Sequence, residues 1–299
     1  MATREASASI PSSSRRRGPF TLLRDAIDDV VSRRRLVGYL VQADAKKKGA
    51  DSLLGNIWWV LDPLLQMAVY VVLVSIIFER PQVDYPLFVF SAILPWKWFT
   101  SSINDSIKSV IDQGQLIRQL QFPKVVLPLA ATFAGVVNFM FGMIPLFSLL
   151  VLFYRDRLTL FLLLIPVIGL VQLTFTIAFS LVLSAVNVFL RDIGNIARHA
   201  LRLWFYLSPG LYALTTLEGS KGLKEHPSLL RVLEANPFAI LFTAYRNVIY
   251  GTVTTNNGAT PPQMPDWASL GALFGGSVIL ILVGMFVFKR LEPSFAKVL

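Results

Sequence analysis

Residues 158–190 read LTLFLLLIPVIGLVQLTFTIAFSLVLSAVNVFL, a stretch of 33 residues without a charged side chain. A helix that crosses a hydrocarbon core of about 30 Å needs about 20 residues, so this stretch is long enough to span a membrane with tilt. The composition agrees: 54% of the 299 residues are hydrophobic, 15% are charged, and the mean hydropathy is +0.59. Soluble domains are about 25% charged. The sequence therefore predicts a polytopic, all-α membrane protein.

Further apolar stretches raise the predicted number of spans to six. They cover residues 57–78, 87–107, 125–154, 203–217 (lengthened by the amphipathic run 193–202) and 268–288. Residues 237–250 are also apolar, but they contain Arg246 and are too short to cross, a length that suits a re-entrant or interfacial helix. The predicted fold class is six transmembrane helices, an N-terminal amphipathic interface helix, and re-entrant outer helices before the sixth span.

The basic residues are distributed unevenly between the predicted loops. The net charge is +10, and 20 of the 28 Lys and Arg residues lie in the two tails and in the loops after the second and fourth spans. Because short cytoplasmic loops are enriched in Lys and Arg, both termini are predicted to be cytoplasmic. Basic residues that lie between apolar runs do not form the water-facing surface of a nucleic-acid binder, so no nucleic-acid partner is expected.

The N-terminal segment divides into two predicted parts. Residues 1–20 are rich in Ser and Arg, which is typical of a disordered basic tail and superficially of a transit peptide. Residues 21–52 are predicted to form an amphipathic interface helix and a connector. Its apolar stripe comprises Leu23, Ile27, Val30, Val31, Val37 and Val41. This stripe suits insertion beside anionic membrane lipids, and a helix packed on a protein partner is the alternative.

Several kinds of chemistry are not supported by the sequence. It has no Cys and two isolated His residues, His199 and His226, which argues against a metal centre or a nucleophilic active site. No Gly-rich phosphate loop is found, and the third to sixth spans contain no acidic residue in their interiors. We therefore expect a transport subunit that is not an enzyme, holds no cofactor, and receives energy from another subunit. An ion-coupled carrier and a membrane-embedded glycosyl- or acyltransferase are the rival classes.

An ordered set of short motifs resembles the permeases of type-2 ABC exporters, in particular those that export O-antigen, capsule, teichoic acid or mycobacterial galactan. The motifs are Ser52-Leu53-Leu54-Gly55 with Trp58 and Pro63-Leu64, Leu94-Pro95-Trp96, Leu116-Ile117-Arg118, Phe122-Pro123-Lys124, Leu127-Pro128-Leu129, the run from Asn187 to Ile193, Ser208-Pro209, Asn236-Pro237-Phe238, Tyr245-Arg246 and Gly251. They cover residues 52 to 251 in order, so the set is more specific than any one of them.

This resemblance implies a permease domain over residues 53–299 that forms a homodimer and binds two ATPase subunits, which bind ATP and Mg. The transported substrate would be a lipid-linked polysaccharide, and export of a small hydrophobic drug or lipid is the alternative. The cytoplasmic loop 112–124 would carry a coupling helix, and residues 218–266 an outer gate loop. The residues expected to couple to the ATPase are Leu116, Ile117, Arg118, Phe122, Arg191 and Asp192.

Aromatic and cationic side chains are the candidates for the substrate pathway, because glycans present apolar C–H faces and their lipid carriers present phosphates. The candidates are Trp96, Lys97, Trp98, Phe99, Tyr206, Tyr212 and Arg246. Lys97 would reach toward the interface, pair with Asp105 or meet a pyrophosphate. Arg246 would face the pore or a headgroup, or pair with an acid such as Glu234. Asn236-Pro237 is typical of a helix start.

Overall fold

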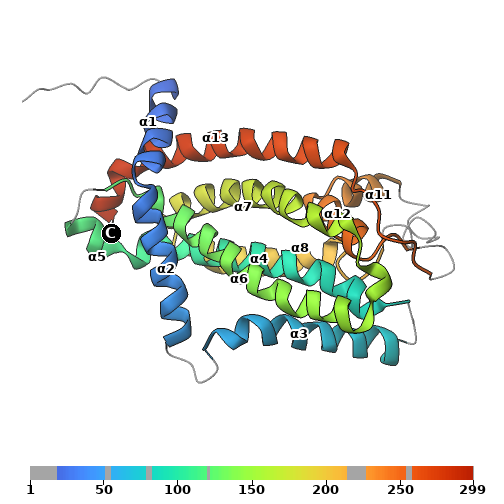
Figure 1. Ribbon diagram of the computed structural model, residues 1–299. Coiled ribbons are helices and arrows are strands. Elements are labelled where there is room, and N and C mark those ends of the chain that lie inside the picture. The colour runs from blue at the N-terminus through green and yellow to red at the C-terminus, as the bar shows by residue number, and fades with distance from the viewer. Residues whose placement is uncertain are drawn as a thin grey trace, which may run out of the picture.

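Long helices that run alongside one another dominate the computed structural model, which describes residues 19–50, 55–78, 83–119, 122–213, 227–253 and 258–298 (Figure 1). The elements are α1 (Pro19–Ser32), α2 (Arg34–Ala50), η1 (Gly55–Ile57), α3 (Trp58–Val71), the π-helix η2 (Val72–Ile77), α4 (Tyr85–Asp112), α5 (Gly114–Gln119), α6 (Val126–Phe153), η3 (Arg155–Arg157), η4 (Leu160–Leu164), α7 (Ile165–Asn187), α8 (Ile193–Leu207), α11 (Pro227–Glu234), α12 (Pro237–Ile249) and α13 (Trp267–Val298). The described residues contain no β-strand beyond an isolated bridge between Val253 and Ala259.

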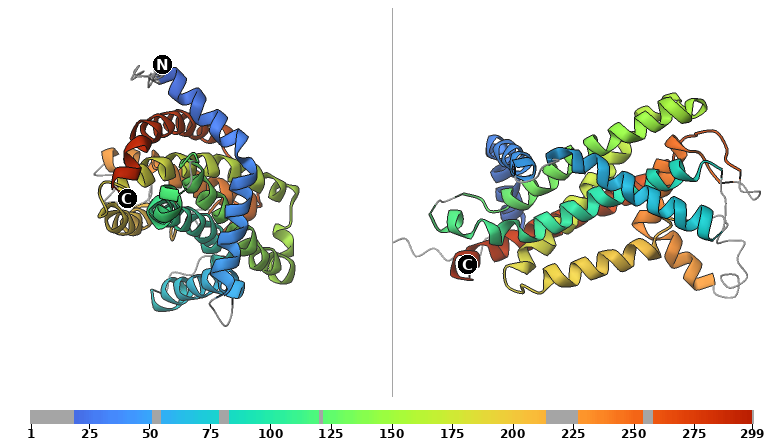
Figure 2. Two further views of the ribbon diagram at one scale, coloured as in Figure 1. Left: turned by 90° about the vertical axis from the view of Figure 1, so that its left-hand side faces the viewer. Right: turned by 90° about the horizontal axis from the view of Figure 1, so that it is seen from below.

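Helix α4 occupies the centre of the bundle. It packs against α3, α6, α7, α8 and α12, while α13 packs along α7 on the far side from α3 (Figure 2, left). Buried hydroxyl groups join α4, α6 and α7: Thr132 lies between Ser106 and Ser180, at 3.2 and 3.0 Å. Small polar side chains of this kind hold transmembrane helices together when they hydrogen-bond across the contact.

Four of the described helical segments are long and apolar enough to cross a membrane. They are Trp58–Ile77, Val126–Phe153, Leu160–Asn187 and Trp267–Phe295, and they match the first, third, fourth and sixth predicted spans. Helix α4 has 28 residues and covers the second predicted span, but its second half is polar. The chain is therefore an all-α, multi-pass membrane protein.

The fifth predicted span ends earlier than predicted. The prediction covers residues 203–217, lengthened by the amphipathic run 193–202; α8 begins with that run at Ile193 but ends at Leu207, and residues 214–217 lie outside the described part of the chain. The cause is Pro209: a residue before proline avoids the helical region, and Ser208 has the extended values φ −99° and ψ 148°. The amphipathic run before residue 203 is therefore the larger part of the helix.

The predicted interface helix forms as two helices, α1 and α2, which run across the ends of the bundle helices (Figure 1). Helix α1 packs on α13 and α2 packs on α6, with Ala26 fully buried and Ile27 and Val31 exposed. The C-terminal end of α13 and helix α5 lie at this same end of the bundle, opposite α11 and α12 (Figure 1). The predicted tail lies outside the described residues up to residue 18, as do residues 51–54 of the connector.

Candidate functional site

A polar stripe runs along the second half of α4. Every half-buried or exposed position from residue 97 to residue 109 carries a polar side chain, whereas the positions between them are buried. This stripe, called the α4 polar stripe below, consists of Lys97, Thr100, Ser101, Asn104, Asp105, Lys108 and Ser109. The spacing of three and four residues places these side chains on one face of the helix. Polar groups at membrane depth face a bundle interior or a water-filled space, so this face marks a candidate site.

The first part of the stripe lines a cavity of about 330 Å³ between α3, α4 and α6. Lys97 Nζ forms an ion pair with Asp62 Oδ2 of α3. Thr100, Ser101 and Asn104 continue the lining, and Asn138 of α6 faces them. The partner of Lys97 is thus Asp62, whereas the ion pair expected from the sequence was with Asp105. Reach of Lys97 toward the interface and its contact with a pyrophosphate stay predictions.

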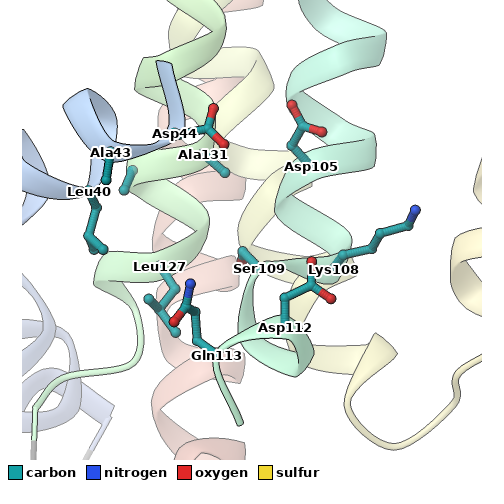
Figure 3. Close-up of a pocket in the computed structure, with 11 residues that line it drawn as sticks. Leu40, Ala43, Asp44, Asp105, Lys108, Ser109, Asp112, Gln113, Leu127 and Ala131 are labelled. Carbon is teal, nitrogen blue, oxygen red and sulfur yellow. The ribbon is translucent and has the colours of Figure 1, made fainter. Parts of the chain in front are cut away.

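The stripe continues into a second cavity of about 220 Å³ between α2, α4 and α6 (Figure 3). Asp105, Lys108, Ser109 and Asp112 of α4 line it together with Asp44 of α2. Figure 3 shows the carboxylates of Asp44 and Asp105 on opposite sides of the space, and Lys108 pointing away from α2. The two cavities therefore follow one another along α4, from the middle of the bundle to the end that carries α5.

The aromatic candidates of α4 lie behind the stripe. Trp96 and Phe99 are 6% and 0% exposed. They pack in an aromatic core that also contains Phe175, Phe179, Trp204, Phe205, Phe238 and Phe242. Trp98 is buried and stacks on Phe139, with 4.6 Å between ring centroids. In the single subunit these rings hold α4, α7, α8 and α12 together, and their contact with substrate stays a prediction.

The two tyrosine candidates lie near the end of α8. Tyr206 is 58% exposed, while Tyr212 is half-buried in the segment that follows the helix. Tyr206 contacts Tyr70 of α3, and Phe205 packs on the same Tyr70 ring at 6.0 Å between centroids. Tyr206 is thus the aromatic candidate whose side chain is open on the surface of the single chain.

Arg246 of α12 is enclosed by backbone carbonyl groups. Its guanidinium donates to the carbonyl oxygens of Pro209 and Gly210 at 2.5 Å each, and to Tyr212 at 3.3 Å and Phe88 at 3.4 Å. It also lies 3.6 Å from the centroid of the Phe88 ring. Glu234 is not among the described contacts of Arg246, so backbone carbonyls replace the expected ion pair. Three of these carbonyls belong to residues 209–212, which follow α8 and lie outside the helices, and the fourth belongs to Phe88 of α4.

The predicted helix start at Asn236-Pro237 is confirmed. Asn236 Oδ1 accepts the backbone N–H of Phe238 at 3.0 Å, and Pro237 occupies the first turn of α12. The same oxygen accepts Trp204 Nε1–H at 3.0 Å, and Asn236 Nδ2 donates to Ser208 Oγ at 2.9 Å. Asn236 therefore fixes the beginning of α12 to the end of α8. Residues 218–226 and 254–257 of the expected gate loop lie outside the described residues.

The expected coupling residues lie at the opposite end of the bundle. Helix α5 forms within the predicted coupling loop; Ile117 is buried and Phe122 half-buried, and both pack with Val110 and Val125. Arg118 is exposed, as are Arg191 and Asp192 in the turn between α7 and α8. The side chain of Leu116 and residues 120–121 lie outside the described residues. Burial on one side and exposure on the other suits a segment that contacts a partner.

A junction of charged groups joins three segments at this end. Lys289 of α13 pairs with Asp29 of α1 and with Glu292, at 2.8 Å for the latter. Glu292 is 8% exposed, and its Oε1 accepts the backbone N–H of Lys124 at 2.7 Å. Helix α1, the end of α13 and the entry to α6 are thereby held together, next to the predicted coupling loop.

The sequence reasoning missed most of the α4 polar stripe. Thr100, Ser101 and Asn104 are not among the predicted site residues, although polar residues at intervals of three and four from Lys97 to Lys108 are present in the sequence and predict a polar helix face. The spacing of residues could not predict the ion pair of Lys97 with Asp62, because the two residues lie 35 positions apart and meet only through the packing of α3 on α4.

Comparison with known proteins gives a consistent result. The chain is 32% identical over 258 residues to the O-antigen export system permease protein RfbA of Myxococcus xanthus, a match that covers 86% of this chain and 93% of that protein. It is 28% identical over 265 residues to a protein of the same name from Klebsiella pneumoniae, covering 88% and 95% of the two chains. No protein-family model matches the chain.

Proposed function

The chain belongs to the family of permease subunits of type-2 ABC polysaccharide exporters, and on this premise we propose that it passes a lipid-linked polysaccharide across the cytoplasmic membrane of a bacterium. The relatives are named as O-antigen export permeases, which favours an O-antigen-type glycan. Cell-wall galactan and teichoic acid have the same general chemistry, a hydroxyl-rich chain on a lipid carrier. The names of the two relatives also favour a glycan over a small hydrophobic drug as the substrate.

The α4 polar stripe is the observation that carries this proposal. A glycan in transit needs hydrogen-bonding partners that replace water without binding tightly, and the short uncharged side chains of Thr100, Ser101 and Asn104 supply them. Lys97, which flanks them on one side, is already paired with Asp62. A hydroxyl-rich chain can therefore exchange hydrogen bonds along these three side chains without a free cation beside them at the Lys97 end.

A second copy of the chain completes the pathway in this proposal. The stripe is open on one side in the single subunit, and the first span buries only 6% of its most apolar window. In a twofold-symmetric dimer the same surface of each copy takes part, so two stripes would enclose one polar conduit. Tyr206 and Tyr70, which are near one another at the edge of this region, would then contact the glycan as well.

Two ATPase subunits, which bind ATP and Mg, would supply the energy from the cytoplasm. Helix α5, with Ile117 anchored and Arg118 exposed, offers a short cytoplasmic surface, and Arg191 and Asp192 add another. This orientation puts α1, α5 and the C-terminal end of α13 on the cytoplasmic side, where the excess of Lys and Arg also lies.

Depletion of the protein in its native cell tests the proposal directly. Lipid-linked glycans should accumulate on the inner leaflet, and re-expression of the wild-type chain should reverse this. Unchanged glycan levels and location after depletion would reject the proposal. Reconstitution with the ATPase subunit then separates the rival classes, because the proposed exporter needs ATP hydrolysis, whereas an ion-coupled carrier would transport with a gradient alone.

A further inference from the structure

Helix α8 presents a strip of cationic and polar side chains away from the bundle. Ala197, Leu201 and Phe205 form its buried face. On the opposite side Asn195, Arg198, Arg202 and Tyr206 are all exposed, and their spacing of three, four and four residues aligns them along one face. This strip is separate from the α4 polar stripe, and its two arginines have no role in the pathway proposed above.

Arg202 differs in its contacts from Lys97, Lys289 and Arg246. Lys97 pairs with Asp62, Lys289 with Asp29 and Glu292, and Arg246 with backbone carbonyls. Arg198 donates to Gly194 and Asn195 of its own helix. Among the described residues, none forms a hydrogen bond or an ion pair with Arg202. An uncompensated arginine inside a bilayer is energetically unfavourable, which favours an external anion as its partner.

The depth of these arginines follows from contacts at the start of α8. Asn187 Nδ2 donates to the carbonyl of Ile107 at 2.8 Å, and Asn187 Oδ1 accepts the N–H of Gly194 at 3.2 Å. The start of α8 is therefore level with Ile107, in the part of α4 that α2 crosses. From Gly194, helix rise places Arg198 about 6 Å and Arg202 about 12 Å further along.

We propose that Arg198 and Arg202 bind the phosphate or pyrophosphate group that links lipid to glycan, as the substrate enters from the inner leaflet; this rests on the proposed function. The depth favours this source of phosphate over ordinary phospholipids, whose headgroups stay at the interface. Exposed apolar side chains flank the strip, with Ile196, Leu203 and Leu207 each at least 60% exposed. A cationic strip beside an apolar surface complements a phosphate carried on a hydrocarbon chain.

Native mass spectrometry of the full-length chain with polyprenyl pyrophosphate as the probe tests the inference. The double variant Arg198→Gln/Arg202→Gln should weaken binding by about tenfold or more, since charge-assisted hydrogen bonds to phosphate are lost. Arg202→Lys keeps the charge and should retain most of the affinity. Arg290→Gln is the matched control, because Arg290 is an exposed arginine on α13 and lies outside the strip.

Phosphatidylglycerol and unphosphorylated polyprenol distinguish the possible sources of binding. Polyprenol should bind weakly and equally to wild type and double variant, and phosphatidylglycerol should not compete with the pyrophosphate. Equal loss of phosphatidylglycerol and pyrophosphate binding would show a general headgroup site and overturn the inference, as would a folded double variant that binds within twofold of wild type. Glycan export by the unmodified protein in cells is measured alongside. If that export depends on the protein, the proposed function holds whether or not the two arginines bind pyrophosphate.

Discussion

The carboxylate of Glu292, near the end of α13, accepts a hydrogen bond from the backbone N–H of Lys124, where the chain enters α6. The two residues are 168 positions apart, and the bond measures 2.7 Å. Because Glu292 also pairs with Lys289, and Lys289 with Asp29, one buried carboxylate joins α1 to the end of the predicted coupling loop. We therefore expect movement of this segment to be transmitted to α13 and α1.

Replacement of Glu292 tests this connection. Glu292→Ala leaves the Lys124 amide without its acceptor and Lys289 with one acidic partner fewer, so stability should fall by about 1–3 kcal/mol. We also expect less glycan exported for each ATP hydrolysed in reconstituted vesicles. Glu292→Gln keeps an acceptor for the amide and should lose less of both. Unchanged transport stoichiometry in a destabilised Glu292→Ala protein would limit the junction to a structural role.

The hydroxyl groups of the α4 polar stripe can be removed with little change in shape. Thr100→Val with Ser101→Ala should lower the export rate several-fold while leaving the melting temperature almost unchanged, because both side chains line an open cavity. Thr174→Val on α7 is the control: its hydroxyl also bonds to its own helix, but it lies away from both cavities along the stripe. If the double variant and the Thr174→Val control lower export equally, the stripe is not part of the pathway.

The pair of Lys97 and Asp62 predicts non-additive effects on export. Lys97→Met should lower export without lowering expression, because Asp62 is left as an unpaired charge beside the stripe. The exchanged pair Lys97→Asp/Asp62→Lys should export better than either single replacement. Stability should change by less than about 1 kcal/mol, since Asp62 is well exposed. A double variant as poor as the worse single variant would show that the cation itself is needed at position 97.

Arg246 is expected to matter for stability before transport. Its forked guanidinium satisfies several carbonyls at once, which one lysine ammonium cannot do, so Arg246→Lys should cost about 2–4 kcal/mol. Thermal unfolding of the detergent-solubilised protein measures this. Arg231→Lys, an exposed arginine on α11, should leave the unfolding temperature unchanged. Similar unfolding temperatures for Arg246→Lys and Arg231→Lys would mean that water or the lysine ammonium satisfies the carbonyls in place of the guanidinium.

Local signals in the sequence were sufficient for much of this architecture. The third span was predicted at 125–154 and runs from Val126 to Phe153, because an uninterrupted apolar run has few alternative structures in a membrane. The helix start at Asn236 was also predictable, since the N–H that its side chain caps belongs to Phe238, two residues away. Pro209 ends α8 at Leu207, whereas the predicted fifth span continues to residue 217, because its hydropathy alone does not show the helix stop.

The site was less predictable, because its contacts join residues distant in sequence. The carbonyls that receive Arg246 lie 34 to 158 positions away, and no local pattern identifies them. Trp96 and Phe99 are predicted pathway residues because aromatic rings pack on sugars, but such rings pack equally well in a hydrophobic core. Burial alone distinguishes these uses, and it depends on how α8 and α12 pack on α4.

The helices of the bundle differ in length, and this has a consequence for the bilayer around them. The segment Trp58–Ile77 has 20 residues and rises about 30 Å, which equals the thickness of a typical hydrocarbon core. Val126–Phe153 has 28 residues and rises about 42 Å. The first span is thus matched to the lipid, while α6 exceeds it by about 12 Å and must tilt or extend into water. A thicker membrane would strain the first span well before α6, so sensitivity to lipid chain length belongs to the first span.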